Sequence, residues 1–167
     1  ILMCGTGFGF SVEKKEVNKL PKVKEIKSGK NLPKIILEDS REGWADSVKI
    51  LMQSLYDGQN LYFDYSQLRP EGARLITMGG RSSGPLPLIK LHDFIRETMH
   101  NAQGRKLTTL ECHDIANQIA EIVVAGGVRR SSQISLSDLD DVEMRHAKDW
   151  PFPIRRAMAN NSAIYRD

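Results

Sequence analysis

The chain has 167 residues, of which 40% are hydrophobic and 27% are charged, with 24 Lys and Arg against 21 Asp and Glu. This balance excludes wholesale disorder and low-complexity classes. No apolar run reaches the roughly 20 residues that span a bilayer, so we expect no integral membrane protein. Two cysteines, Cys4 and Cys112, are too few for a disulfide scaffold and fit a reducing cytoplasm. Because the chain starts within an apolar run and stops soon after another begins, we expect a fragment of a longer protein.

The net charge of +3 is concentrated in one segment. Residues 13–34 hold eight lysines and three glutamates, a local balance of +5, with prolines, a glycine and no aromatic residue. A nucleic-acid-binding face is expected to have aromatic residues or arginines among its basic side chains. We therefore expect a solvated surface segment and no nucleic-acid partner. A polyanion-binding protein is the alternative, and salt-dependent retention on nucleic acid through residues 13–34 would support it.

The first third of the chain predicts strands around one helix. Residues 1–12 are typical of a buried strand or a strand and turn. Short alternating segments at 23–26 and 34–37 indicate edge or hairpin strands. A helix is expected to begin after an N-cap at Asp39 or Ser40 and to end at Gly58. Its apolar stripe repeats at steps of three and four residues and predicts core positions, namely Trp44, Val48, Leu51, Met52 and Leu55.

The rest of the chain continues the alternation. Strands are expected at 61–65, 73–78 and 132–136, and helices at about 86–101 and from Thr108 or Thr109 to Gly126. The expected core stripes of these two helices are Leu88, Leu91, Ile95 and Met99 with Phe94, and Ile115, Ile119, Ile122 and Val123. A solvated turn at 138–141, a short charged helix to about 148 and a last helix or strand follow. This order predicts an α/β architecture with at least some parallel strand pairing.

Two glycine–arginine–serine loops carry the clearest chemistry. The first follows an expected strand, the second follows an expected helix, and their residues are Gly79, Gly80, Arg81, Ser82 and Ser83, then Gly126, Gly127, Arg129, Arg130, Ser131 and Ser132. Paired glycines let backbone N–H groups approach an anion, arginines supply forked charged donors and serines add hydroxyls. The loops predict a ligand with several phosphates. Neither is a Walker motif, and the other interpretation is that the glycines only form turns and the arginines face solvent.

Other candidate functional residues give weaker evidence of a site. Cys112 and His113 are neighbours on an expected helix, so their side chains point in different directions and form no nucleophile–base pair. Cys4, in an apolar setting, is expected to be a small buried side chain. The histidines show no metal-ligand spacing, so we expect no metal site.

The motifs taken in order resemble the adenosylcobalamin-dependent (class II) ribonucleotide reductases, and most closely their ribonucleoside-triphosphate branch. The matching segments are 3–12 (MCGTGFGFSV), 39–44 (DSREGW), 64–66 (DYS), 69–74 (RPEGAR), 79–85 (GGRSSGP), 113–115 (HDI) with 127–131 (GVRRS), and 157–162 (AMANNS). They extend over essentially the whole chain. The ordered series is far more specific than any one member.

The resemblance implies part of a ten-stranded α/β barrel with a small α+β insertion. Residues 1–12 and 68–167 would be barrel core segments, and residues 13–67 the insertion typical of this branch. The two glycine–arginine–serine loops would be the specificity loops beside which a deoxynucleoside triphosphate effector binds. The second loop would pass the choice of base to the ribonucleoside triphosphate substrate.

The implied parent is a cytoplasmic allosteric oxidoreductase of deoxyribonucleotide biosynthesis, which serves DNA replication. Adenosylcobalamin starts thiyl-radical chemistry in that family, and thioredoxin is the reductant. The family's radical cysteine lies in an Asn-x-Cys-x-Glu motif that these 167 residues lack, so the fragment alone should be inactive and holds no catalytic residue. The alternative function is a non-catalytic nucleotide-phosphate-binding regulatory module.

Overall fold

The computed structural model describes residues 2–4, 6–27, 32–76, 79–125 and 132–165. These residues form two compact units, the first from 1–21 and 106–167, the second from 22–105. None of the helices in the described ranges is long and apolar enough to cross a bilayer. The units group residues that are close in space, and the division into core and insertion segments at 12/13 and 67/68 stays a prediction.

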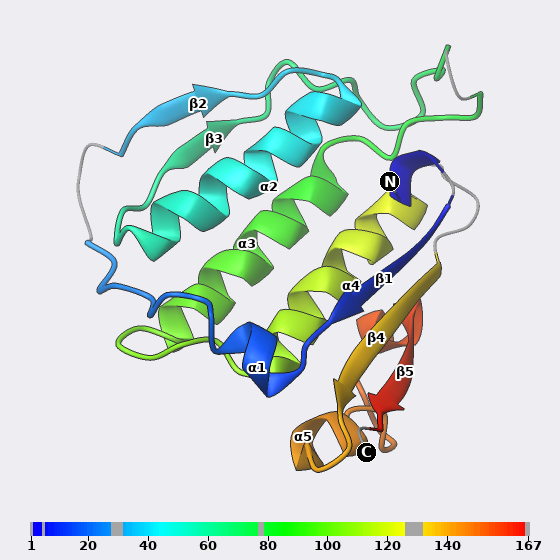
Figure 1. Ribbon diagram of the computed structural model, residues 1–167. Helices are drawn as coiled ribbons and strands as arrows, with labels where there is room; N and C mark the ends of the chain where they lie inside the picture. The colour runs from blue at the N-terminus through cyan, green and yellow to red at the C-terminus, as the bar shows by residue number, and fades with distance from the viewer. Residues whose placement is uncertain (1, 5, 28–31, 77–78, 126–131, 166–167) are drawn as a thin grey trace. The chain divides into compact units, whose positions relative to one another are not determined.

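The first unit is a parallel sheet with one long helix along it (Figure 1). Its strands lie in the order β1–β4–β5, both pairings are parallel, and α4 contacts β4. The elements are η1 (Leu2–Cys4), β1 (Gly7–Ser11), α1 (Lys14–Val17), α4 (Thr109–Ala125), β4 (Ser132–Asp138), α5 (Val142–Arg145), η2 (Ile154–Met158) and β5 (Ala159–Ile164).

The alternation of buried and exposed side chains along β4 shows that α4 covers one face of this strand. Gln133, Ser135 and Ser137 are buried, whereas Ile134 between them is 45% exposed. Because strand side chains alternate between faces, one face of β4 lies under α4 and the other is open within this unit. A small apolar cluster of Val12, Val17 and Met144 closes the end of the sheet near α1 and α5.

A reciprocal cap begins α4, as the sequence predicted. The Thr108 hydroxyl accepts from the backbone N–H of Glu111 at 3.1 Å, and the Glu111 carboxylate accepts from the N–H of Thr108 at 2.8 Å. Each side chain thus satisfies a donor that the first helical turn leaves free. The helix ends at Ala125, directly before the expected Gly126.

The second unit packs two helices, which run parallel to each other and antiparallel to the strands, against a small parallel sheet (Figure 1). Its elements are β2 (Lys34–Ile36), α2 (Arg41–Tyr56), β3 (Tyr62–Asp64) and α3 (Leu86–Asn101). Ser40 caps α2 by accepting from the N–H of Gly43 at 2.9 Å, and Gly58, with φ of 75°, follows its last turn. The core unites both helices and β3 through fully buried side chains, namely Leu51, Leu55, Phe63, Leu88, Leu91, Ile95 and Met99.

A buried histidine joins three elements of this core. His92 on α3 lies 2.9 Å from the Ser47 hydroxyl and 2.8 Å from the Tyr65 hydroxyl, so both ring nitrogens are paired. Its ring stacks on Phe63 with centroids 4.4 Å apart. Burial lowers the pKa of His92 to about 3 and keeps the ring neutral at pH 7.

The two ends of the second unit are tied to each other. The N–H of Val23 donates to the carbonyl of Arg105 at 2.9 Å, and the N–H of Gly104 donates to the carbonyl of Val23 at 2.9 Å. The Gln103 side chain also accepts from the N–H of Ile26 at 2.6 Å. The point where the chain enters this unit therefore lies beside the point where it leaves.

Several expectations about strands and exposure were wrong. Val23 makes only an isolated bridge, to Gln103, and the described residues 73–76 contribute a single bridge at Arg74 instead of a strand. Of the two alternatives for residues 34–37, the edge strand is confirmed and the hairpin is wrong, because β2 pairs in parallel with β3 in a two-stranded sheet. Residues 7–11 are largely exposed and so is Cys4, because within the first unit β1 is an edge strand with one open face. Trp44 and Phe94 are only half-buried.

The expected α/β class with parallel pairing is confirmed. In the described ranges the sheets have three strands and two strands, and the ten-stranded barrel stays a prediction.

Replacing Thr108 by Ala should lower the free energy of unfolding by about 1 kcal/mol, because the first turn of α4 loses its reciprocal cap. Urea unfolding measures the loss. The Thr108→Ser variant keeps the hydroxyl and should unfold like the unsubstituted protein. An equal loss in both variants would contradict the role of the hydroxyl.

Acid should destabilise the second unit through His92. Unfolded histidine binds a proton near pH 6.5, while folded His92 binds one only near pH 3. The contribution of neutral His92 to the free energy of unfolding is therefore fully present above about pH 6.5. It is lost progressively as the pH drops from about 6.5 towards 3. Urea unfolding at several pH values should show a shallower dependence for His92→Phe. Equal slopes would contradict this assignment.

Candidate functional site

The first glycine–arginine–serine loop is one arm of a tight hairpin in the second unit. Backbone bonds join Gly72 N–H to the Ser82 carbonyl at 2.9 Å and Ser82 N–H to the Ala73 carbonyl at 2.8 Å. A third bond joins Leu75 N–H to the Gly80 carbonyl at 3.1 Å. Residues 79–83 therefore return along residues 72–75, with Arg74 bridged to Arg81. Residues 77–78 lie outside the described residues.

The paired glycines of the first loop both have left-handed backbone. Gly79 and Gly80 have φ of 69° and 84°, in the left-handed region where side chains are strained. A Cβ at either position would meet no atom within 4 Å. These glycines therefore serve the path of the backbone, and the space beside them is free for a ligand to approach.

Gly84 has a different role at the base of the hairpin. Its φ is 69°, and a Cβ there would lie 2.9 Å from the backbone nitrogen of Glu71. The N–H of Gly84 donates to the Ser82 hydroxyl at 3.0 Å. Close packing at Gly84 therefore fixes the hairpin directly before Pro85 and the start of α3.

Arg81 presents a guanidinium on the surface of this hairpin. Its Nη1 donates to the Gly72 carbonyl at 2.9 Å, and the residue is exposed. This bond uses one of the five N–H donors of the group. It therefore anchors the arginine to the hairpin while leaving the fork partly open to solvent.

The structure describes the two elements that flank the second loop. Helix α4 ends at Ala125 and β4 begins at Ser132, as expected for a connection between a helix and a parallel strand. Five predicted site residues, Gly126, Gly127, Arg129, Arg130 and Ser131, lie outside the described residues. Arg81 belongs to the second unit and this loop to the first, so their shared effector site stays a prediction.

The interface between α4 and β4, the two elements that flank the second loop, is polar. His113 lies 2.9 Å from the Ser135 hydroxyl through Nδ1, and the Gln133 side chain donates to the Ala116 carbonyl at 3.2 Å. Burial lowers the pKa of His113 to about 4, so the ring is neutral at pH 7. Sequence reasoning missed this layer, although polar residues at every second position of 133–137 were its signal.

An ion pair at Asp114 joins α4 to η2. Arg156 of η2 donates from Nε and Nη2 to the two oxygens of Asp114, each at 2.7 Å, and Arg155 adds a contact of 3.6 Å. Such a bidentate arrangement fixes orientation as well as charge. It holds η2 against α4.

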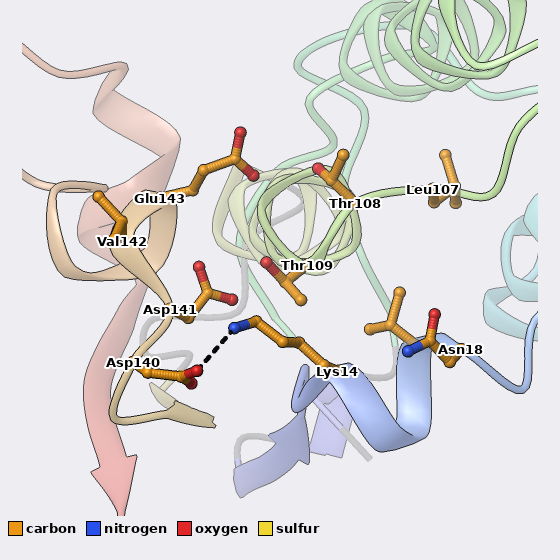
Figure 2. Close-up of a pocket in the computed structure, with 10 residues that line it drawn as sticks. Lys14, Asn18, Leu107, Thr108, Thr109, Asp140, Asp141, Val142 and Glu143 are labelled. Atoms are coloured by element: carbon orange, nitrogen blue, oxygen red, sulfur yellow. Dashed lines mark hydrogen bonds and ion pairs between the residues drawn. The ribbon is translucent and has the colours of Figure 1, made fainter.

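A shallow cavity of about 410 Å³ lies at the start of α4 (Figure 2). Lys14 contacts Asp140 at 3.1 Å, and this hydrogen bond raises the pKa of the Lys14 ammonium above its ordinary value. Asp141 is 4% exposed and caps α5 by accepting from the N–H of Met144. The expectation of a solvated turn at 138–141 was wrong for Asp141. Acidic side chains here suit the positive ends of two helices, which is a structural role.

No three His, Cys, Asp or Glu side chains within the described ranges converge to hold a metal ion. Among the described lysines of residues 13–34, five form ion pairs with acidic neighbours, including Lys24 with Asp57 at 3.8 Å and Lys34 with Asp64 at 2.7 Å. These pairs agree with a solvated surface segment.

Comparisons with known proteins identify relatives along the whole chain. Residues 12–99 match the family model described as "B12-dependent ribonucleotide reductase, insertion domain". Adenosylcobalamin-dependent ribonucleoside-triphosphate reductases of Euglena gracilis and Lactobacillus helveticus are 36% and 30% identical over 79% and 98% of this chain. A crystal structure of a B12-dependent (class II) ribonucleotide reductase superposes with a TM-score of 0.82, at 30% identity over 97% of the chain. The chain spans 19% and 27% of the lengths of the two reductases, and 27% of the crystallised chain.

Replacing Gly84 by Ala should destabilise the hairpin more than replacing Gly80 by Ala. Both variants place a side chain at positive φ, at a cost of about 1–2 kcal/mol, but only Gly84→Ala adds a contact of 2.9 Å with backbone. Urea unfolding and protease sensitivity within residues 72–84 report the difference. Equal destabilisation would show that crowding at Glu71 does not matter.

Proposed function

Because the chain belongs to the B12-dependent (class II) ribonucleotide reductase family, we propose that it is the effector-binding part of a ribonucleoside-triphosphate reductase. The reaction proposed for the full-length protein replaces the ribose 2′-hydroxyl by hydrogen and releases water. A cysteine pair outside these residues supplies two electrons, and thioredoxin reduces the resulting disulfide.

The hairpin at residues 72–83 is the observation that supports effector binding. It combines open backbone at two left-handed glycines with the exposed guanidinium of Arg81. Backbone N–H groups and a guanidinium are the donors that phosphate oxygens accept. We assign Gly79, Gly80, Arg81, Ser82 and Ser83 to the phosphates of a deoxynucleoside triphosphate effector.

The second loop is proposed to complete this site. Arg129 and Arg130 supply further charge for the triphosphate, while Gly126, Gly127 and Ser131 supply backbone and hydroxyl donors. The loop would then connect the effector with the substrate base. The proposed ten-stranded barrel of the parent would hold both loops at one end of its strands.

Adenosylcobalamin is the cofactor proposed for the full-length protein, where it supplies the radical that begins the reaction. The cavity that the described residues form beside Lys14 does not fit it. The cavity beside Lys14, of about 410 Å³, is in the range of drug-sized ligands and is lined largely by charged and hydroxyl side chains. A corrin macrocycle needs a broader cradle, so we assign no cobalamin contact to these residues.

The test uses the full-length reductase that contains this chain. Arg81→Ala and the double variant Arg129→Ala/Arg130→Ala should weaken deoxynucleoside triphosphate binding by about 10- to 100-fold, the usual effect of losing a charged hydrogen bond. They should also reduce the effector-dependent change in kcat/KM between two ribonucleoside triphosphates. Equilibrium dialysis and competition assays measure these two quantities.

Arg41→Ala removes an exposed arginine from α2 and serves as the charge-matched control. It should leave effector binding unchanged. Unaltered effector affinity and substrate choice in both arginine variants of the loops would refute the assignment.

A further inference from the structure

The helix–strand interface of the first unit contains a layer that we call the polar seam, formed by His113, Asn117, Gln133 and Ser135. All four residues are at most 3% exposed. His113 and Asn117 are one turn apart on α4, and Gln133 and Ser135 are two residues apart on β4. Both pairs therefore face the same interface, since these spacings keep side chains on one face of a helix and of a strand.

Two hydrogen bonds define the register of the helix along the strand. His113 pairs with Ser135, and Gln133 donates to the carbonyl of Ala116. Rising residue numbers on α4 thus meet falling numbers on β4. A helical turn rises about 5.4 Å and two strand residues span about 6.6 Å, so both contacts form together in this register.

Stability does not explain the seam. Among the residues that the structure describes, Nε2 of His113, both amide atoms of Asn117 and Oε1 of Gln133 are buried and have no hydrogen-bond partner. Each such group carries a desolvation cost, and apolar side chains of similar size would fill the layer without it. What directional polar contacts add over apolar packing is resistance to sliding, because a displaced helix breaks them.

The seam lies next to the second loop. Gln133 is one residue beyond the start of β4, and α4 extends two turns from Asn117 to its end at Ala125. The ends of the 126–131 connection are therefore carried by the two elements that the seam joins. Any axial slip of α4 along β4 changes the separation of those ends by the same amount.

We propose that the polar seam is a positioning device for effector-controlled substrate choice, with His113, Gln133 and Ser135 as positioning residues. By locking α4 to β4 it holds both ends of the second loop at a fixed separation. The effect of the bound nucleotide on the loop is then not lost through a movement of α4 along β4. This inference rests on the proposed function and assigns a regulatory role to residues that touch neither nucleotide.

The test compares Ser135→Ala and Gln133→Leu with Ser137→Ala in the full-length reductase. Ser137 is also buried on the same face of β4, beyond the seam, and is the matched control. Gln133→Leu should unfold at the same or a higher urea concentration than the unsubstituted enzyme, whereas Ser135→Ala should unfold at a somewhat lower one, because it leaves Nδ1 of His113 buried without its partner. Their affinity for a deoxynucleoside triphosphate should stay within about twofold.

The informative readout is the effector-induced change in the kcat/KM ratio of two ribonucleoside triphosphates. Allosteric coupling of this kind is usually about 5- to 150-fold, and the seam variants should lose most of it while Ser137→Ala keeps it. Should Gln133→Leu fail to fold, Ser135→Ala decides alone, because it removes one oxygen.

The outcomes separate the two proposals. Normal coupling in folded seam variants overturns this inference and leaves the proposed function standing. Loss of effector affinity in parallel with coupling also overturns it, because the seam would then support the binding site itself. An unsubstituted enzyme that binds no deoxynucleotide overturns the proposed function, and this inference with it.

Discussion

Parallel pairing of β1 with β4 is the constraint on which the first unit depends. Two adjacent parallel strands cannot be joined by a tight turn, so the chain must return to the starting edge through a crossover. Helix α4 supplies that return, and its polar face therefore lies against β4. The connection from Ala125 to Ser132 follows directly from this path. The position of the second glycine–arginine–serine loop is thus a consequence of strand direction.

The two buried histidines show how differently polar groups are used in the two units. His92 has both ring nitrogens paired and an aromatic ring stacked on it, so its environment satisfies it fully. His113 has one paired nitrogen, and its other nitrogen is buried with no partner in the described part of the chain. The first arrangement is typical of a stable core. The second retains an energetic cost beside the loop to which regulation is assigned.

Local signals in the sequence predicted the long helices and the strands β2, β3 and β4 well, but not which strands pair with each other. Ser40, Thr108 and Gly58 lie at helix ends for reasons of capping and left-handed backbone, which depend on a few neighbouring residues. The parallel direction of β2 and the bridge of Arg74 to Arg81 depend on partners distant in sequence or on turn geometry. The glycine pair at 79–80 was recognised correctly as a special bend. The hairpin that carries it was not, because alternating apolar residues at 73–78 indicated a strand.

The family was readable from ordered motifs, whereas the polar seam was not. Alternating Gln133, Ser135 and Ser137 are typical of a strand with one solvated face, and the structure places that polar side under a helix. The alternation at 133–137 was a signal for one polar face of the strand, but the burial of that face is decided by the crossover helix that covers it. The proposed juxtaposition of Arg81 with Arg129 and Arg130 would likewise depend on partners distant in sequence, which no local pattern specifies.

The hydrogen bonds that join Val23 to Gly104 and Arg105 bring together the two places where the chain enters and leaves residues 22–105. Because the two ends of this segment lie side by side, the segment adds little more than the span of a short linker to the connection between β1 and β4. Such a cassette can be lengthened, exchanged or deleted during evolution without shifting the register of β1 on β4. The reductase scaffold can in this way acquire a new regulatory surface while its strand order stays unchanged.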